Sequence, residues 1–251
     1  MTMSLRWNLV SVDETSSTQD LADRLAAVGA TEGTVVMART QSVGRGRTGK
    51  SWLSPAGGLY VSLVLKPPPS SPLPLLPLAT TFAVVDGLKS SVGVRPLVRW
   101  PNDVLLEGKK VGGVICEANF ANHRLSHVIV GVGVNCNSSA KSLGRLSRAA
   151  TTLAVETNRE IDIDAVLRGF LSSFEPIYEH WVAGHDLVGE RKTEISTIGK
   201  KVELRERGTG RMLTCLAKDV LRDGSLVILH RGTQRTVKAE DVDSLAELAP
   251  A

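Results

Sequence analysis

The sequence predicts an α+β protein in which a mixed or largely antiparallel sheet is followed by a small all-β domain. In the first half, strands follow one another as hairpins, at Val104–Leu106, Val111–Ala118 and His127–Val134. Consecutive hairpins build antiparallel or mixed sheets, not doubly wound ones. From Gly199 onward, short apolar stretches alternate with glycine-containing turns, which is typical of an SH3-like barrel.

The bulk composition indicates a globular protein with no marked preference for one class of partner. The 251 residues are enough for one large and one small domain, and 42% of them are hydrophobic. The formal net charge of +4 weakly favours anionic ligands, but no long Lys/Arg tract indicates nucleic acid. The three cysteines form no CxxC pair, so we expect reduced thiols in a cytosolic protein and neither disulfides nor a zinc site.

The first elements are predicted to be a strand followed by a helix. Asn8–Glu14 has the composition of a short strand, and Ser17 is a residue type that caps helix N-termini. Leu21, Leu25 and Val28 follow at the i, i+4 and i+7 spacing of one apolar helix face.

The remaining elements follow from residue type and from helix breakers. Further strands are expected at Thr34–Arg39, Gly58–Leu65 and Leu97–Arg99, a turn at Asn119–Ser126, and helices at Leu76–Ser91 and Ile163–Ala183, the latter kinked at Pro176. The strands of the second domain are expected at Lys201–Arg205, Met212–Ala217, Ser225–Leu229 and Arg235–Lys238. No apolar run reaches ~18 residues and no signal peptide is expected, so no membrane span is predicted.

The segment Gln41–Ser54 has neither helical nor strand periodicity, and Gly44–Lys50 within it reads Gly-Arg-Gly-Arg-Thr-Gly-Lys. Its glycines permit close approach to a ligand, and an arginine fork fits a carboxylate or phosphate in a bidentate way. The spacing is not that of a Walker A loop. Taken alone, the motif could also be a solvated basic loop or an RGG-like contact with nucleic acid. Its glycines favour a loop that becomes ordered when ligand binds.

Two further motifs could carry chemistry. The run Trp100-Pro101-Asn102-Asp103 follows a strand and forms a defined turn, in which the Asn and Asp side chains could orient a base or bind magnesium. Lys110 begins a strand and precedes Gly112-Gly113, so its ammonium group can reach a ligand that lies on bare backbone. A structural turn and a hairpin lysine in water are the alternative interpretations of each motif by itself.

Glycines in a strand and a helix start complete the candidate motifs. Gly131 and Gly133 alternate along one strand and leave a groove on one face of it. Ser17-Thr18-Gln19 opens a helix, whose free N–H groups can bind a carbonyl or an anion. A bulged strand and ordinary capping are the alternatives. The histidines show no metal-binding spacing, and no GxSxG or GxGxxG motif occurs.

Taken together and in this order, these motifs resemble those of the biotin–protein ligase family. The matching residues are Ser17-Thr18-Gln19, Gln41, Gly44–Gly49, Trp52, Tyr60, Trp100–Asp103, Lys110–Gly113 and Gly131–Asn135. The resemblance implies a catalytic ligase domain over residues 1–190, similar to class II aminoacyl-tRNA synthetases, and an SH3-like domain over residues 199–251. Because the motifs begin at Ser17, we expect a ligase-only member without the N-terminal DNA-binding domain.

The resemblance implies that the protein activates biotin with ATP to biotinyl-5′-AMP and transfers biotin to a lysine of a carrier protein. It assigns the hydrogen bonds to the ureido ring of biotin to Ser17, Thr18 and Gln41. Trp52 would cover the ligand pocket, and Gly113 and Gly133 would shape its floor. Gln19 departs from the Asn of many members, which puts a side-chain contact there in doubt.

The same resemblance assigns the anionic groups of the substrates to cations. Arg45 and Arg47, in a loop whose Gly44 and Gly46 approach the ligand, would clamp the biotin carboxylate and the ATP phosphates. Lys110 would stabilise charge on the attacking carboxylate and the α-phosphate. Bringing two anions together requires such preorganised cations.

The remaining assignments concern metal, proton transfer and partners. Asn102 and Asp103 would support Mg²⁺ or position the loop, Asp103 would accept a proton from the acceptor lysine, and Asn135 would contact the nucleotide. Expected substrates and cofactors are ATP, biotin and Mg²⁺. The expected partner is the carrier domain of acetyl-CoA, acyl-CoA or pyruvate carboxylase, with no DNA or membrane partner, for a cytoplasmic monomer or weak homodimer.

Two alternative functions stay open at this point. A lipoate–protein ligase shares the implied core fold, although the Gly-Arg loop and the Trp-Pro-Asn-Asp run favour biotin. A basic nucleic-acid-binding module would use the Arg loop and the SH3-like tail. The absence of a helix-turn-helix pattern and the 4% aromatic content count against the second alternative.

Overall fold

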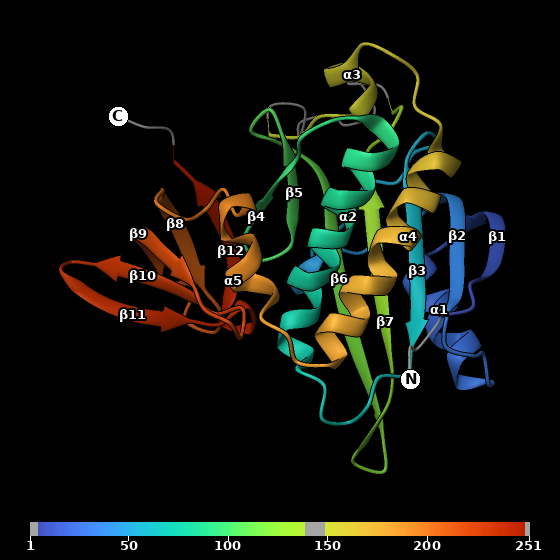
Figure 1. Ribbon diagram of the computed structural model, residues 1–251, viewed down its shortest axis with the longest axis horizontal. Coiled ribbons are helices and arrows are strands. Elements are labelled where there is room, and N and C mark those ends of the chain that lie inside the picture. Colours follow the sequence, from blue (N-terminus) through green and yellow to red (C-terminus); the bar gives the residue numbers. More distant parts are fainter. Residues whose placement is uncertain (1–4, 139–148, 249–251) are drawn as a thin grey trace.

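The computed structural model describes residues 5–138 and 149–248, and two sheets dominate it (Figure 1). The first sheet has seven strands. In spatial order they are β1 (Asn8–Thr15), β2 (Thr34–Gln41), β3 (Leu59–Leu65), β7 (Arg124–Val134), β6 (Lys109–Ala121), β5 (Asp103–Leu106) and β4 (Leu97–Arg99). Only the β1–β2 pair is parallel among the described strand pairs, so the predicted mixed, largely antiparallel sheet is confirmed.

Two long helices cover one face of this sheet, and a shorter helix covers the other (Figure 1). The long helices are α2 (Leu76–Val92) and α4 (Ile163–Val182), and the shorter one is α1 (Thr18–Ala27). Side chains alternate between the two faces: Val35 packs in the large core with the long helices, whereas Val36 packs against α1. Two five-residue helices, α3 (Leu153–Thr157) and α5 (Leu187–Arg191), complete the first part of the chain.

The helix α2 and the short turn before it are apolar enough to cross a membrane by length and composition alone. The stretch Leu73–Val92 has a mean hydropathy of 1.2, and 72% of its most apolar window is buried inside the protein. Its side chains pack between the sheet and α4, as expected for the central helix of a core. The apolar character is therefore accounted for by packing within the fold.

The helix α1 does not bury the face that the leucine spacing predicts. Ala22 and Ala26 are the buried apolar residues, while Leu21 and Leu25 pack only at the margin and Val28 is 83% exposed. Small side chains on the inner face let the helix lie close to the sheet, so the larger residues flank the contact. The prediction of the buried face was wrong for this reason.

The β6–β7 hairpin is longer than the sequence predicts. The segment expected to be a turn, residues 119–126, instead continues the pairing, with Asn119 opposite His127 and Ala121 opposite Arg124. The turn itself contains only Asn122 and His123, both with positive φ (49° and 61°). Two successive positive φ angles suit the right-handed twist of a two-residue hairpin.

The second sheet has five antiparallel strands and contains every strand predicted after Gly199. In spatial order these are β11 (Thr233–Val237), β10 (Leu226–His230), β9 (Met212–Val220), β8 (Lys201–Glu206) and β12 (Val242–Glu247). The last of them, β12, was not predicted. The division into domains at residues 190 and 199 remains a prediction.

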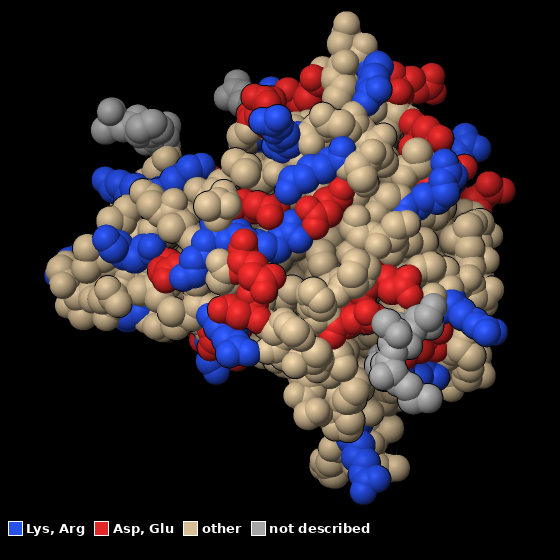
Figure 2. Space-filling model, in the orientation of Figure 1, with Lys and Arg blue, Asp and Glu red and all other residues tan. Residues whose placement is uncertain are grey.

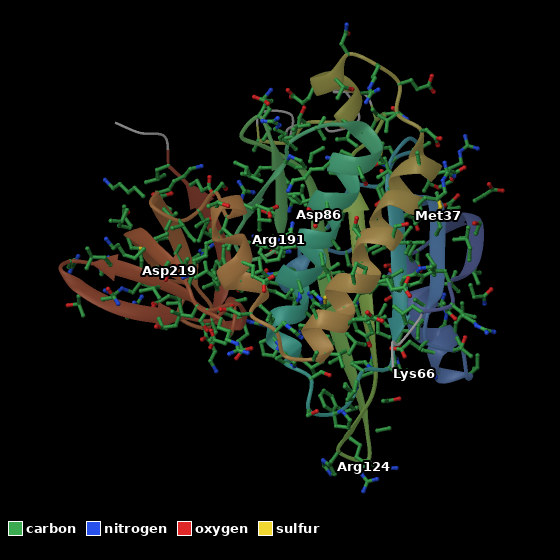
Figure 3. The ribbon with its side chains drawn as sticks, viewed as in Figure 1. Met37, Lys66, Asp86, Arg124, Arg191 and Asp219 are labelled. Atoms are coloured by element: carbon green, nitrogen blue, oxygen red, sulfur yellow. The ribbon has the colours of Figure 1, made fainter. Side chains whose placement is uncertain are left out.

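The two sheets are joined by specific contacts as well as by the chain. The Trp100 indole donates to the Gly224 carbonyl (2.8 Å), and its main-chain N–H donates to Thr197 Oγ1 (3.0 Å). On α5, Arg191 pairs with both oxygens of Asp86 on α2, at 2.6 and 2.7 Å (Figure 3). The Trp100–Gly224 contact ties the second sheet to the end of β4, and the Arg191 pair ties α5 to α2.

Charged side chains on the molecular surface show no segregation by sign on the face in view. Figure 2 shows Lys and Arg interspersed with Asp and Glu over the helices and the second sheet. This face therefore carries no extended patch of positive charge.

We expect the contact between α2 and α4 to depend on the absence of a side chain at Gly87. A Cβ there would lie 2.6 Å from the Phe170 nitrogen and 2.7 Å from its Cα, which are backbone atoms that cannot rotate away. Gly87→Ala gains up to about 1 kcal/mol of helix propensity, but overpacking costs about 1–3 kcal/mol. We predict a net loss of about 1–2 kcal/mol in the free energy of unfolding, measured by urea denaturation.

The exposed Ser90 on the same helix provides the matched control. Ser90→Ala should change the free energy of unfolding by less than about 0.5 kcal/mol. A Gly87→Ala protein that is as stable as the wild type, or more stable, would contradict close packing of the two helices at this point.

Candidate active site

A cavity of about 330 Å³ lies on the α1 face of the first sheet and is closed by the second sheet. Every site residue predicted from the sequence lines it except Gly44. The lining runs from the start of α1, across the glycines of β6 and β7, to β12 of the second sheet. Residues far apart in the sequence therefore meet in one place, although their individual roles stay predictions.

Three glycines form the floor of the cavity, and a different side chain lies over each. A Cβ on Gly131 would lie 2.5 Å from Gln19 Oε1, and one on Gly133 would lie 2.6 Å from the Trp52 ring. Gly113, paired with Gly133 across the β6–β7 ladder, has the Lys110 ammonium over it, 3.3 Å from a Cβ position. The bare strand surface thus lets polar and aromatic groups approach the backbone closely.

The end of the cavity next to α1 is polar but uncharged. Gln41 Oε1 accepts from the Thr18 N–H (2.8 Å) and from its hydroxyl (3.1 Å), and Gln41 Nε2 donates to Ser54 Oγ (2.7 Å). The buried Ser62 hydroxyl lies 2.9 Å from Thr18 Oγ1 and 3.0 Å from Gln19 Oε1. Hydroxyl and amide groups held in this way can exchange hydrogen bonds with a neutral polar ligand.

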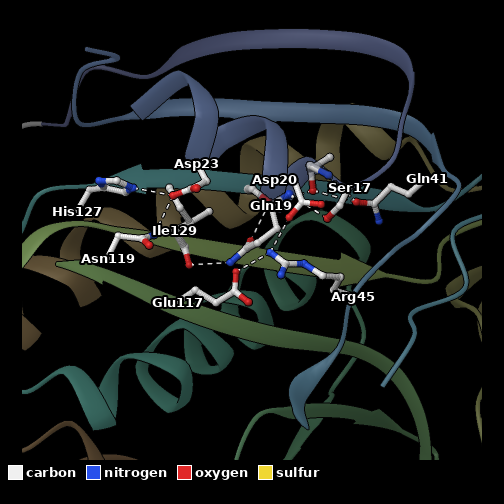
Figure 4. Close-up of polar contacts among 12 residues, drawn as sticks. Ser17, Gln19, Asp20, Asp23, Gln41, Arg45, Glu117, Asn119, His127 and Ile129 are labelled. Carbon is white, nitrogen blue, oxygen red and sulfur yellow. Dashed lines mark hydrogen bonds and ion pairs between the residues drawn. The ribbon is translucent and has the colours of Figure 1, made fainter. Parts of the chain in front are cut away.

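The start of α1 is fixed by its cap and by Gln19. Ser17 Oγ accepts from the Gln19 N–H (3.3 Å), which confirms the predicted N-cap. The Gln19 amide donates to the Ile129 carbonyl (3.0 Å), so this side chain ties the helix to β7 (Figure 4). Its contacts are structural, and a direct role of Gln19 toward a ligand stays a prediction.

Arg45 is held by two carboxylates from different elements. Its Nη2 lies 2.8 Å from Asp20 Oδ1 on α1 and 2.7 Å from Glu117 Oε2 on β6 (Figure 4). These three side chains are each about 40% exposed, so the pairs are screened and weak. An anionic ligand group could replace either carboxylate at low cost.

Asp103 lies between two cations. Lys110 Nζ is 2.5 Å from Oδ1, and Arg99 Nη2 is 2.6 Å from Oδ2. Burial acts to raise the pKa of Asp103, but the Lys110 and Arg99 cations outweigh burial and hold this pKa below its ordinary value. The ionised Asp103 carboxylate therefore keeps the Lys110 ammonium group beside the cavity.

The geometry bears on two expected roles of Asp103, proton acceptor and magnesium ligand, and favours neither. Both oxygens are occupied by cations, and a carboxylate with a lowered pKa is a poor proton acceptor, so a general-base role is not supported. A magnesium ligand would need a free oxygen. In residues 5–138 and 149–248, no three His, Cys, Asp or Glu side chains are grouped to hold a metal ion.

Asn102, Asn135 and Gly44 have structural contacts within the protein. The Asn102 amide donates to the Val114 carbonyl, and the Asn135 amide donates to the Thr151 carbonyl (3.0 Å). Gly44 lies behind the cavity wall, where a Cβ would be 2.4 Å from the Trp52 carbonyl oxygen. These residues hold the backbone around the cavity, and any contact of theirs with a nucleotide stays a prediction.

The segment Gly44–Lys50 docks on the second sheet. Arg47 donates to the carbonyls of Ala239 (3.1 Å) and Val242, and Lys50 Nζ lies 3.1 Å from the Asp243 carbonyl. Burial lowers the pKa of Arg47, while Asp103 acts in the opposite direction. The described loop is thus held by protein contacts, and whether ligand binding orders it further stays a prediction.

Several residues of the site could not be recognised from the sequence. Arg99 heads the predicted run Arg99–Asp103, but its pairing with Asp103 was not predicted, and no local pattern marks Asp243. Ser62 did carry a signal, because it is a small polar residue in the fully buried strand β3. The cavity as a whole combines an uncharged polar end with a cationic end, which suits a ligand with a neutral polar head and an anionic tail.

Comparison with known proteins assigns this arrangement to a family. A model described as the biotin/lipoate A/B protein ligase family matches residues 11–135. The bifunctional ligase/repressor BirA of Bacillus spizizenii is 36% identical over 178 residues, which are 70% of this chain and 55% of that protein's length. The biotin–[acetyl-CoA-carboxylase] ligase of Paracoccus denitrificans is 29% identical over 217 residues, which are 82% of this chain and 88% of that protein.

A solved structure has the same fold over nearly the whole chain. The biotin protein ligase from Aquifex aeolicus, in complex with biotin and ATP, matches with a TM-score of 0.82 and 29% identity. The match covers 96% of this chain and 99% of that one. The expected catalytic fold, with its second small β domain, is therefore confirmed.

We predict that Asp103→Asn destabilises the protein in a pH-dependent way. Removing the charge leaves Arg99 and Lys110 partly buried without their anion, which costs about 3 kcal/mol at pH 7. Because the folded-state pKa is lowered, this stabilisation is complete above the unfolded pKa of about 3.9 and is lost as pH falls through the folded value. Urea denaturation at several pH values measures it.

The difference in unfolding free energy between wild type and Asp103→Asn should be constant from pH 7 to pH 5 and should shrink below about pH 4. If the two proteins had the same unfolding free energy at pH 7, an ionised Asp103 between two cations would be contradicted. A difference that already disappears between pH 7 and pH 5 would contradict it as well.

Proposed function

The chain belongs to the biotin/lipoate A/B protein ligase family, and we propose that it is an ATP-dependent biotin–protein ligase. The proposal rests on the cavity described above, in which an uncharged polar end and a cationic end lie over the glycines of β6 and β7. Biotin has the matching form, a neutral ureido head and a carboxylate tail. The names of the relatives, and the biotin and ATP bound in the Aquifex aeolicus structure, also support a biotin–protein ligase.

In the proposed first reaction, the biotin carboxylate attacks the α-phosphorus of ATP and pyrophosphate leaves. The product is the mixed anhydride biotinyl-5′-AMP. Two anions approach each other in this step, so the cations at the cavity must offset their repulsion. Lys110 has the best position, because Asp103 holds its ammonium beside the floor at Gly113.

In the proposed second reaction, the uncharged ε-amine of a carrier lysine attacks the biotinyl carbonyl carbon. The new C–N bond forms as the C–O bond to phosphate breaks, and AMP leaves with that electron pair. The amine nitrogen loses its remaining extra proton to solvent. Asp103 takes no part as a base in this scheme, since both its oxygens are paired.

The wall of the cavity protects biotinyl-5′-AMP, the intermediate between the two reactions, from water. A mixed anhydride hydrolyses if water reaches it, and the docked segment Gly44–Lys50 covers the cavity from the side of the second sheet. Trp52 lies on Gly133 and 5.1 Å from the Lys110 ammonium, so it separates the neutral end from the cationic end. Its buried indole N–H has no partner in the described part of the chain and is available to a ligand.

The described residues contain no group of three His, Cys, Asp or Glu side chains that could hold a metal ion, and both oxygens of Asp103 are paired with cations. We propose that Mg²⁺ enters as part of the MgATP substrate.

The proposed protein partner is the carrier domain of a biotin-dependent carboxylase, as the name of the Paracoccus denitrificans relative suggests. Three free thiols agree with the proposed cytoplasmic location. The protein is proposed to act as a monomer or weak homodimer, without DNA.

The lipoate alternative can be weighed on the chemistry of the neutral end. Gln41, Thr18 and Ser62 already bond to one another, and the dithiolane ring of lipoate offers no N–H or carbonyl group that could add a hydrogen bond to them. The ureido group of biotin offers both kinds of group. Incubation with MgATP, a carrier domain and either cofactor tests this by mass spectrometry: biotinylated lysine supports the proposal, and lipoylation alone would overturn it.

We predict that Lys110→Ala slows adenylate formation about 100-fold, the cost of removing one preorganised charge from a transition state. Arg99 still pairs with Asp103 in this variant, so the fold should persist, as a thermal melt can check. Biotin-dependent exchange of pyrophosphate measures the step. The control is Lys109→Ala, which removes an exposed neighbour that pairs with Glu156. Unchanged exchange in Lys110→Ala would refute the assignment.

We also predict that Arg47→Ala releases biotinyl-5′-AMP about tenfold faster, because the loop loses charge-assisted hydrogen bonds to the carbonyls of Ala239 and Val242. Rapid gel filtration of enzyme loaded with labelled biotin measures the release. Arg39→Ala, on the exposed face of β2, is the control and should retain the adenylate as the wild type does. Equal retention by Arg47→Ala would show that docking of the loop does not hold the intermediate.

A further inference from the structure

The cavity has a second carboxylate whose role the ligase reaction as described does not explain. Asp243 lies on β12, is partly buried and lines the cavity. Within residues 5–138 and 149–248, its carboxylate has no hydrogen bond or ion pair, although its main-chain carbonyl accepts from Lys50. The other carboxylate of the lining, Asp103, is fully paired.

The backbone that carries Asp243 is fixed relative to the Arg loop. Arg47 donates to the carbonyl of the preceding residue, Val242, while Lys50 and the Thr48 hydroxyl contact the Asp243 carbonyl at 3.1 and 3.4 Å. Three loop residues therefore hold one short stretch of β12 at the wall of the cavity. The Asp243 side chain is presented from a rigid strand, which is a requirement for a binding group.

The charges around this end of the cavity explain why a free carboxylate is needed. Five cations line the cavity, namely Arg45, Arg47, Lys50, Arg99 and Lys110, against the carboxylates of Asp103 and Asp243. The net charge of +3 suits ATP and the adenylate. It opposes a lysine, whose ε-amine carries a proton at neutral pH and must enter the same place.

We propose that the Asp243 carboxylate receives the ammonium group of the acceptor lysine and directs it to the adenylate. This inference rests on the proposed biotin–protein ligase function and names the subsite for its second substrate. Asp243 pairs with the charged form and positions it. The proton that must leave before attack passes to solvent, so Asp243 is a binding group and not the base.

The test separates the two half-reactions of the full-length protein. Adenylate formation is followed by pyrophosphate exchange, and transfer is followed with adenylate-loaded enzyme and increasing concentrations of a carrier domain. Asp243→Asn should raise the KM for carrier about tenfold, the effect of losing one charge-assisted contact, while exchange changes less than about twofold. Asp243→Glu should recover most of the loss.

Two controls keep the inference falsifiable. Asp241→Asn removes an exposed carboxylate two residues away, with the same change in net charge, and should transfer biotin normally. Hydroxylamine, an uncharged nucleophile at neutral pH, should react with the adenylate on Asp243→Asn as fast as on wild type. A slower hydroxylamine reaction, or a raised KM for ATP, would overturn the inference in favour of a structural or nucleotide-binding role.

Failure of this inference is distinguishable from failure of the proposed function. If the wild-type protein does not biotinylate the carrier at all, the proposed function fails. If the wild type transfers biotin and Asp243→Asn transfers it with the same KM for carrier, only the assignment of Asp243 fails.

Discussion

The site depends on keeping several cations close together before any anionic substrate is present. Arg99 and Lys110 would repel each other, but Asp103 lies between them and contributes one oxygen to each. The carboxylate is charged because of these cations, and they keep their positions because of it. A cluster arranged in this way can stabilise developing negative charge without reorganising during the reaction.

A second consequence is that the small C-terminal sheet is part of the active site. Among the described residues, Arg47 and Lys50 form no ion pair with a carboxylate, and they are held by main-chain carbonyls of residues 239–243. Carbonyl acceptors fix the positions of these cations without neutralising them. The second sheet can therefore support the loop while leaving its positive charge for phosphate groups.

The sequence predicts the elements better than it predicts their contacts. The strands and long helices follow from apolar runs and from glycine and proline, and the ordered motifs bring nearly all site residues into one cavity. It does not predict the pairing of Asp103, because Arg99 and Lys110 become neighbours only through the β4–β5–β6 ladders. Nor does it predict β12, whose polar composition conceals a strand that closes the site.

The position of Arg45 shows how the neutral and charged ends of the cavity can be coupled. Its guanidinium contacts Asp20, in the first turn of the helix that carries Thr18 and Gln19, and Glu117 on β6. A ligand carboxylate that takes the place of Asp20 on Arg45 leaves the Asp20 carboxylate free. Asp20 lies in the same helix turn as Thr18, which is proposed to bind the ureido ring. Exposed pairs of this kind contribute little stability, so the exchange costs little. Arg45 can therefore accept a substrate anion although it is fully paired without one, and its pairing with protein carboxylates is compatible with the predicted clamp.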